Sequence, residues 1–334
     1  MSVAVYLLNL ITGEHTPCPL PSDTPYRFVS ALGNFDGVHL AHRRLLTQTI
    51  EIAKQRTGLG SPAVAAAFCF ATPSGDYFSE KPQHLTTLSE KLALFAACGL
   101  RYAFIADFPS LRNLSPELFI NEILICHCAT DAIVCGYNFH FGQNGQGDCN
   151  TLQQHFGENC TVLPRVDINL NGTPATVSSS AVRSLLLSGD CDAAAKMLCR
   201  PYALTAPVVH GKRLARSLGL PTANMLFPPK KLVPQHGVYA VRCFVDGKEY
   251  FGVSNVGYRP TVDGSDAILN CETHILGFAG DLYDKEITVN FCHKLRGEKR
   301  FEDIATLKAA ILADIDAALA YFNASPPKVN DCIT

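Results

Sequence analysis

The chain has 334 residues, which is long enough for two domains of ordinary size. Its 28 Lys and Arg residues nearly balance its 30 Asp and Glu residues, and no basic run is present, so we expect no nucleic-acid partner. The first residues lack a secretory signal, and no apolar run approaches the roughly 18 residues of a membrane span. These features predict a cytoplasmic protein that acts on small molecules and has no membrane partner, and they leave the oligomeric state open.

Fourteen cysteines do not change this prediction. Several lie inside apolar segments, where reduced thiols pack as small hydrophobic side chains: Cys69, Cys98, Cys135, Cys243 and Cys271. The group Cys126, His127 and Cys128 lacks a second ligand pair at metal-binding spacing, so we expect no metal there.

Strand and helix patterns alternate through the first half of the chain. Strands are expected at 28–32, 62–70, 102–106 and 131–135, and helices at 41–54, at 89–98 and from 115–117 onward. This order predicts a parallel sheet with helices on both sides. A ligand is then expected beyond the carboxyl ends of the strands.

The sequence LGNFDGVHLAH, residues 32–42, follows the first of these strands. Gly33 and Gly37 let the backbone approach a ligand, and His39 and His42 share one face of the first helical turn. A helix N-terminus attracts anions and disfavours a protonated histidine, so neutral imidazoles would donate hydrogen bonds to phosphate during nucleotidyl transfer. The alternatives are a helix start with two solvated histidines, or half of a metal site.

Two further polar segments follow in the first half. GYNFHFG, residues 136–142, comes directly after the expected strand at 131–135, and Asn138 offers an amide to a phosphate or base. VSSSAVR, residues 177–183, is typical of a serine-capped helix start with Arg183 over its first turn, which makes a second phosphate site. A tight turn with buried aromatics explains the first segment equally well, and simple capping explains the second.

The second half has a different pattern. A short helix within 188–202 forms a linker, and strands are then expected at 204–209, 238–245, 250–256, 268–276 and 287–291, with a hairpin turn at Asp246–Gly247. An amphipathic helix at 304–322 ends the pattern, and a tail occupies 324–334. This predicts a small, closed antiparallel barrel with a terminal helix.

A second group of polar residues lies in this half. Thr222 and Asn224, in an extended segment, are expected to point the same way and to bind a phosphate-bridging magnesium ion. Glu272 lies on the face of its strand opposite Cys271 and its alternating apolar neighbours, and its carboxylate can accept a proton from an alcohol that attacks a γ-phosphate. A proline turn and a surface glutamate are the structural alternatives.

The ordered motifs resemble those of the prokaryotic bifunctional riboflavin kinase/FMN adenylyltransferases. They are LGNFDGVHLAH, GYNFHFG, VSSSAVR, VVHGKRLARSLGLPTAN, GVYAV, GVSNVGYRPT, ETHILGFAGDLYDKEI and LRGEKRF, from residue 28 to residue 322. The resemblance implies a Rossmann-like nucleotidylyltransferase domain at 1–187 that makes FAD and pyrophosphate from FMN and ATP. It also implies a riboflavin kinase barrel at 203–323 that makes FMN with ATP and Mg²⁺.

The resemblance also implies residue roles. His39 and His42 would stabilise adenylyl transfer, and Glu272 would be the kinase base. Nucleotide or phosphate contacts in the first domain would come from Gly33, Asn34, Phe35, Asp36, Gly37, Asn138, Ser178, Ser179 and Arg183. Mg-ATP in the kinase would be bound by Gly211, Lys212, Gly219, Thr222 and Asn224, with Arg296 in a flavin-side loop.

The chain departs from the family pattern at several positions, most of them in the first half. Ala41 replaces a glycine, which is expected to crowd the triphosphate or to strain a backbone at positive φ. Thr176 replaces an arginine, an aromatic-acid-proline motif appears only as FATPS at 70–74, and Ala215 replaces a loop glycine in the kinase half. One alternative is therefore a riboflavin kinase whose first half only binds flavin or nucleotide, which would form FMN but no FAD.

Two other classes of protein share some of these features. HLAH also occurs in class I aminoacyl-tRNA synthetases, which should in addition show a lysine-rich catalytic loop and a basic surface. A flavin sensor without activity would give no reason for Thr222, Asn224 and Glu272 to occur together.

Overall fold

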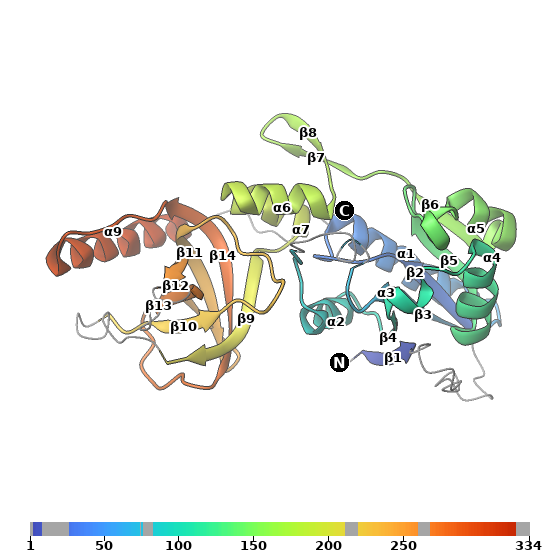
Figure 1. The fold of residues 1–334 in the computed structure, drawn as a ribbon, viewed down its shortest axis with the longest axis horizontal. Coiled ribbons are helices and arrows are strands. Elements are labelled where there is room, and N and C mark those ends of the chain that lie inside the picture. Colours follow the sequence, from blue (N-terminus) through green and yellow to red (C-terminus); the bar gives the residue numbers. More distant parts are fainter. Residues whose placement is uncertain are drawn as a thin grey trace. The chain divides into compact units, whose positions relative to one another are not determined.

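The computed structural model describes residues 3–8, 27–73, 75, 83–210, 220–259 and 268–324. It divides the chain into two compact units, residues 1–177 and 178–334, and each is described by itself (Figure 1). The helices around the predicted linker lie in the second unit. They are α6 (Ser179–Ser188) and α7 (Cys191–Leu198).

The first unit is built on a six-stranded parallel sheet with the order β1-β4-β3-β2-β5-β6. Its strands are β1 (Ala4–Leu8), β2 (Arg27–Leu32), β3 (Ala63–Phe70), β4 (Tyr102–Ala106), β5 (Thr130–Gly136) and β6 (Cys160–Leu163). All neighbouring pairs are parallel. The predicted parallel sheet is confirmed, with β1 and β6 added at its two edges.

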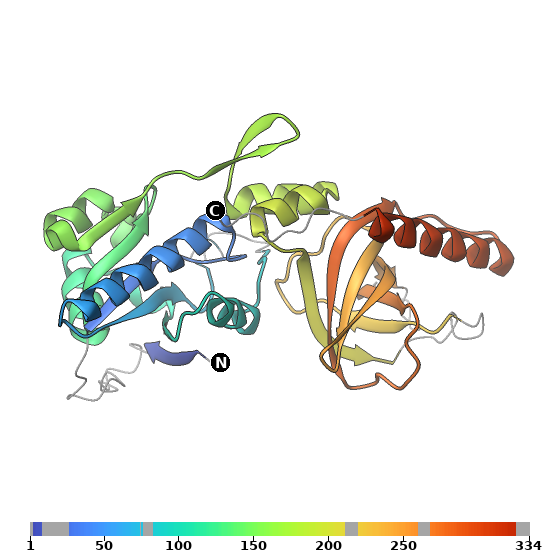
Figure 2. The same cartoon turned by 180° about the vertical axis from the view of Figure 1, so that it is seen from behind.

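Helices cover both faces of this sheet (Figures 1 and 2). Alternate strand residues face opposite sides, so Val29 and Ala31 join one apolar core while Phe28 joins the other. The first core includes residues of α1 (Leu40–Gly58) and α2 (Leu88–Ala97). The second includes residues of α3 (Phe108–Leu111), the π-helix Phe119–His127 and α5 (Cys149–Phe156). The short helix α4 (Pro116–Leu118) leads directly into the π-helix.

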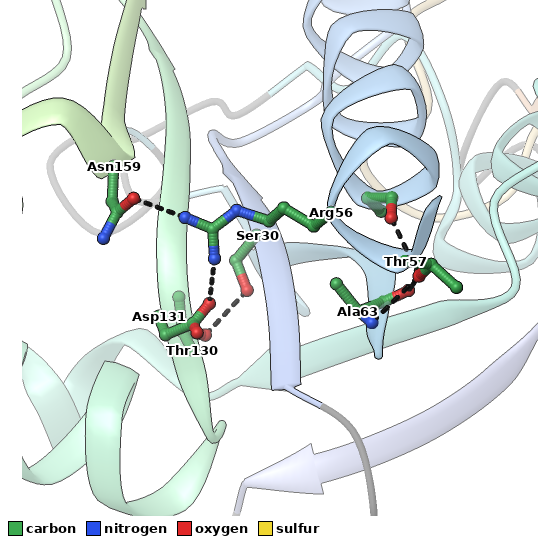
Figure 3. Close-up of polar contacts among 8 residues, drawn as sticks. Ser30, Arg56, Thr57, Ala63, Thr130, Asp131 and Asn159 are labelled. Atoms are coloured by element: carbon green, nitrogen blue, oxygen red, sulfur yellow. Dashed lines mark hydrogen bonds and ion pairs between the residues drawn. The ribbon is translucent and has the colours of Figure 1, made fainter. Parts of the chain in front are cut away.

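Polar contacts fix the end of α1 against the amino ends of the strands (Figure 3). Arg56 donates a hydrogen bond of 2.8 Å to the carboxylate of Asp131 at the start of β5, and a second one to the side chain of Asn159. The hydroxyls of Ser30 and Thr130 lie 2.7 Å apart between β2 and β5. Because the end of α1 is held at this edge, the start of α1 lies at the carboxyl edge of the sheet.

The second unit contains a closed six-stranded barrel with the order β10-β13-β12-β11-β14-β9. Its strands are β9 (Tyr202–Val209), β10 (Ala223–Leu226), β11 (Gly237–Val245), β12 (Lys248–Arg259), β13 (Ile268–Ile275) and β14 (Glu286–Arg296). All of these pairs are antiparallel, and β9 closes the barrel by pairing with β10. The predicted barrel is confirmed, and so is the Asp246–Gly247 turn, whose two residues both have positive φ.

The terminal helix α9 (Ile304–Asn323) packs on the outside of this barrel. Ala318 and Phe322 join an apolar cluster with Val238, Ala240 and Val253. The Phe322 ring also stacks on Phe251, with centroids 4.3 Å apart. The predicted amphipathic helix is therefore confirmed, with one stripe against the strands.

Twelve cysteines lie in the described residues, all with free thiols, and nine of them are buried. The prediction of core thiols is confirmed for Cys69, Cys135, Cys243 and Cys271, whereas Cys98 is half-buried.

Within the same described ranges, no three His, Cys, Asp or Glu side chains are arranged to hold a metal ion. A search of these ranges also found no helix with the length and apolar character needed to cross a membrane.

Candidate active sites

The sheet brings two of the predicted motifs together in the first unit. Leu32 pairs with Cys135, so β2 and β5 end side by side and the loops that follow them start at the same edge. The chain passes from β2 to β3 on one side and returns to β5 on the other, which makes this edge a topological switch point. Ligands of doubly wound sheets bind at such a point.

The loop after β2 has an unusual backbone. Phe35, Gly37 and Val38 have φ values of 51°, 82° and 41°. For residues with side chains this region costs of order 1–3 kcal/mol each, so tertiary contacts must hold it. The side chains of Phe35 and Val38 are fully buried, and the Phe35 ring packs on Phe95 with centroids 5.3 Å apart. Phe35, predicted to contact nucleotide, has its side chain in the core.

Asp36 is also predicted to contact phosphate, but in the structure its side chain binds backbone N–H groups. Its carboxylate accepts hydrogen bonds from the backbone N–H groups of Leu85 and Thr86 at 2.9 and 3.1 Å. The N–H of Gly37 donates to the Thr86 hydroxyl at 3.1 Å. A buried carboxylate would repel phosphate, so Asp36 instead fixes the 33–39 loop against the segment before α2.

His39 and His42 form a stacked pair at the start of α1. Their ring centroids lie 3.6 Å apart, and His39 is the N-cap residue whose Nδ1 accepts from the His42 backbone N–H at 3.3 Å. Because that nitrogen accepts, a neutral His39 carries its proton on Nε2. Burial, followed by the charges of His39 and Lys91, holds the pKa of His42 well below its usual value of 6.5. The predicted neutral imidazole is therefore supported at His42.

Of the two expectations for Ala41, the strained backbone is not borne out, and crowding of the triphosphate stays a prediction. Ala41 is the second residue of α1 and is not among the residues with positive φ in the described chain. Its methyl group therefore causes no backbone strain of the kind that glycine would relieve. Thr176, the other departure, ends the short hairpin of β7 (Asp167–Leu170) and β8 (Thr173–Thr176), where its hydroxyl donates to Asp167 at 2.7 Å.

Lys91 is a residue of this region that the sequence analysis missed. It lies in the first turns of α2, is only 1 % exposed, and donates from Nζ to the carbonyls of Asn34 and Phe70 at 2.9 and 3.4 Å. Its burial could have been predicted from the sequence, because Lys91 lies on the same apolar face of the helix as Leu88 and Phe95.

The loop at 136–142 is anchored as predicted. The Phe141 ring is buried against Phe119, with centroids 5.2 Å apart, and it stacks on Phe139. Asn138 is exposed, and its carbonyl accepts from Nδ1–H of His140 at 3.0 Å. Its amide is thus presented at the surface of the sheet's carboxyl edge.

The serine block begins α6 in the second unit. Ser178 is the N-cap residue, and its hydroxyl oxygen accepts from the Ala181 N–H at 3.1 Å, which confirms the predicted capped start. Ser179 is the first residue of α6, and Arg183 lies one turn later. A phosphate-binding role for these residues remains a prediction.

The barrel brings the predicted kinase residues together on its outer face. Asn224 on β10 pairs with Glu272 on β13, and the Thr222 hydroxyl donates to Oε1 of Glu272 at 2.6 Å. The alternate residues Cys271 and Thr273 are fully buried, so Glu272 faces away from the barrel interior as expected. Asn255 lies opposite Glu272 on the other neighbouring strand, β12.

Two further residues of β13 position this group. Asn270 is 5 % exposed and donates from Nδ2 to Oδ1 of Asn224 at 2.9 Å, while its own Oδ1 is buried without a hydrogen-bond partner among the described residues. His274 donates from Nδ1 to the carbonyl of Pro221 at 2.8 Å, which fixes the turn before Thr222. The sequence places both beside Glu272 on one face of the strand but predicts no role for either. The predicted residues Gly211, Lys212 and Gly219, and also Ala215, lie outside the described residues.

Arg296 is not in a loop, and this prediction is corrected. It is the last residue of β14, and its guanidinium forms a two-pronged ion pair with Asp314 of α9 at 2.8 and 2.7 Å. The Asp314 side chain is 9 % exposed. Arg296 therefore attaches the terminal helix to the barrel, and its guanidinium is already engaged.

Replacing Arg296 with methionine is expected to destabilise the second unit by about 2–3 kcal/mol, because the largely buried Asp314 loses its charged partner. Denaturant unfolding followed by circular dichroism measures this change. Arg300→Met, at an exposed arginine nearby, is the control and should change stability by less than about 0.5 kcal/mol. Equal stabilities of the two variants would contradict the assigned role.

Comparison with known proteins agrees with this division of the chain. The FAD synthetase family profile matches residues 22–181, and the riboflavin kinase profile matches residues 198–322. Bifunctional riboflavin kinase/FMN adenylyltransferases align over nearly the whole chain. The Pseudomonas fluorescens protein is 39 % identical over 94 % of this chain and 96 % of its own, and the Bacillus subtilis protein is 31 % identical over 92 % and 96 %.

A solved structure shares the fold. The crystal structure titled as a macrolide-efflux protein from Streptococcus pneumoniae superposes with a TM-score of 0.77 at 23 % identity, covering 89 % of this chain and 95 % of that one. The two domains thus define a transferase of flavin-cofactor synthesis with one kinase and one nucleotidyltransferase domain. The chain belongs to the bifunctional riboflavin kinase/FMN adenylyltransferase family.

Proposed function

We propose that the barrel phosphorylates riboflavin with Glu272 as general base. The carboxylate accepts the proton of the riboflavin hydroxyl, whose oxygen bonds to the γ-phosphorus of ATP while the bond to the β-phosphate oxygen breaks and ADP leaves. The contact between Thr222 and Glu272 carries this assignment. The hydrogen bond engages Oε1, whereas Oε2 has no partner among the residues that the structure describes and is available for the proton.

The same face suits a magnesium ion. The Thr222 hydroxyl donates a hydrogen bond to Glu272, so the lone pairs of the Thr222 oxygen stay available. Asn224 offers an amide oxygen. The unpartnered buried oxygen of Asn270 adds a third neutral oxygen beside them. Magnesium prefers such oxygen ligands together with substrate phosphates, so we propose that Thr222 and Asn224 hold it. When bound, the ion supplies charge stabilisation to the transferred phosphate.

For the first unit we propose adenylyl transfer at the carboxyl edge of β2 and β5. A phosphate oxygen of FMN bonds to the α-phosphorus of ATP, and the bond to the bridging oxygen breaks to release pyrophosphate. Nε2–H of His39 and the neutral His42 ring would donate to the oxygens that gain charge. Asn138 is a proposed phosphate contact, and Gly33, Asn34 and Gly37 are proposed to contact ATP through their backbone. We also propose that Ser178, Ser179 and Arg183, at the start of α6 in the second unit, bind phosphate.

The purified full chain should convert riboflavin to FMN and then to FAD when supplied with ATP and magnesium. Chromatography of the products over time measures both steps, and FMN supplied directly tests the second alone. Excess EDTA is expected to reduce both rates at least about a hundredfold, and added magnesium should restore them. Formation of FMN without FAD would contradict the function of the first unit, and unchanged rates in EDTA would contradict the role of the metal.

A further inference from the structure

Lys91 is a buried cation for which the described structure provides no counter-charge. Its two hydrogen bonds go to backbone carbonyls, those of Asn34 and Phe70, although an ammonium group has three protons to donate. No carboxylate pairs with it in the part of the chain that the structure describes. The third proton therefore has no protein partner among these residues.

This arrangement is costly without a ligand. Burying a charge is expensive unless it is paired, and the position adds to the cost because Lys91 lies in the first turns of α2, near the positive end of the helix dipole. Carbonyl dipoles compensate only part of a full charge. An anion beside Nζ would compensate the rest.

The position of the ammonium indicates which anion this is. Asn34 belongs to the loop after β2, and Phe70 is the last residue of β3, so Nζ lies at the carboxyl edge of neighbouring strands. His42 is close enough for its pKa to be lowered by the charge of Lys91. The ammonium and the histidine pair therefore lie at the same edge of the sheet.

We propose that Lys91 binds the phosphates of ATP that leave as pyrophosphate during adenylyl transfer. This inference rests on the proposed function of the first unit. As the bond between the α-phosphorus and the bridging oxygen breaks, the electron pair stays on pyrophosphate, and Lys91 stabilises that charge. The two carbonyl contacts hold the ammonium in place between the loops after β2 and β3.

Lys91→Met is expected to reduce kcat/KM for ATP in FMN adenylylation by about ten- to a hundredfold, because a charge-assisted phosphate contact is lost. Lys91→Arg keeps the charge and should recover part of the loss. Lys54→Met, at an exposed lysine of α1, is the matched control and should behave as the wild type. Riboflavin phosphorylation by the same samples should be unchanged, since it takes place in the other unit.

A second measurement tests whether Lys91 acts through its charge or only by bridging the carbonyls of Asn34 and Phe70. The charged groups that lower the pKa of His42 are His39, on the same helix start, and Lys91 on α2. Lys91 lowers the pKa of His42, so Lys91→Met should raise that pKa and shift the acid limb of the adenylylation pH profile to higher pH. Lys91→Arg should leave the limb in place.

The outcomes distinguish the two levels of the proposal. If the wild-type chain forms no FAD, the function of the first unit is wrong. If it forms FAD, and Lys91→Met retains both the wild-type kcat/KM for ATP and the wild-type acid limb, the role of Lys91 is wrong. Should Lys91→Met not fold, Lys91→Gln, which keeps amide donors for the two carbonyls but no charge, is judged by the same two measurements.

Discussion

Glu272→Gln is expected to reduce riboflavin phosphorylation by about 10²- to 10⁴-fold while FMN is still converted to FAD. Glutamine retains an oxygen that can accept from the Thr222 hydroxyl, so the loss would come from the missing base rather than from a broken contact. Initial rates measured separately from riboflavin and from FMN, at saturating ATP and magnesium, test this.

The control for Glu272 is Glu286→Gln, an exposed glutamate at the start of β14. This change should leave both rates within about twofold of the wild type. If Glu272→Gln phosphorylated riboflavin as fast as the control, another group would have to take the proton. If it abolished both conversions in a folded protein, the assignment of separate sites would be wrong.

His42→Ala is expected to have the opposite effect, with FMN adenylylation lowered about 10²- to 10³-fold and riboflavin phosphorylation unchanged. The substitution removes the ring that stacks on His39 and that burial keeps neutral. In the wild type, the lowered pKa of His42 should keep its ring neutral as the pH falls through 6.5, because the ring becomes protonated only well below that value.

His155→Ala, at an exposed histidine of α5, is the control for His42. The rate of FAD formation from FMN is measured by chromatography, and the far-ultraviolet circular dichroism of each variant reports folding. NMR signals of the His42 ring, recorded between pH 5 and 8 and assigned by their absence in His42→Ala, report its protonation. A midpoint near pH 6.5 for the His42 ring signals would show that His42 titrates as an ordinary histidine. That result would contradict the buried, neutral state assigned here.

Much of the fold could be predicted from sequence because its signals are local. Near-continuous apolar runs such as 62–70 mark strands buried on both faces, and the cap at Ser178 and the turn at Asp246–Gly247 depend only on nearby residues. The edge strands β1 and β6 were missed. Both carry the apolar, strand-forming runs AVYLL and CTVL, but such short runs are ambiguous until a neighbouring strand pairs with them.

Individual site residues were less predictable where distant partners decide what a side chain does. The resemblance predicts a phosphate contact at Asp36, whereas its carboxylate accepts hydrogen bonds from the backbone N–H groups of Leu85 and Thr86. Arg296 was placed in a flavin-side loop, yet it ends β14 and pairs with Asp314. In both cases the partner lies on another element, so no local spacing could have revealed it.

The sequence by itself determined the order of the motifs, the two halves of the chain and the helical spacing of His39 and His42, because these depend on periodicity and neighbouring residues. Only the tertiary structure decided that β2 lies beside β5, that Asn224 lies opposite Glu272, and that Lys91 is buried between two loop carbonyls. The physical reason is that strand pairing and burial are set by packing between distant segments.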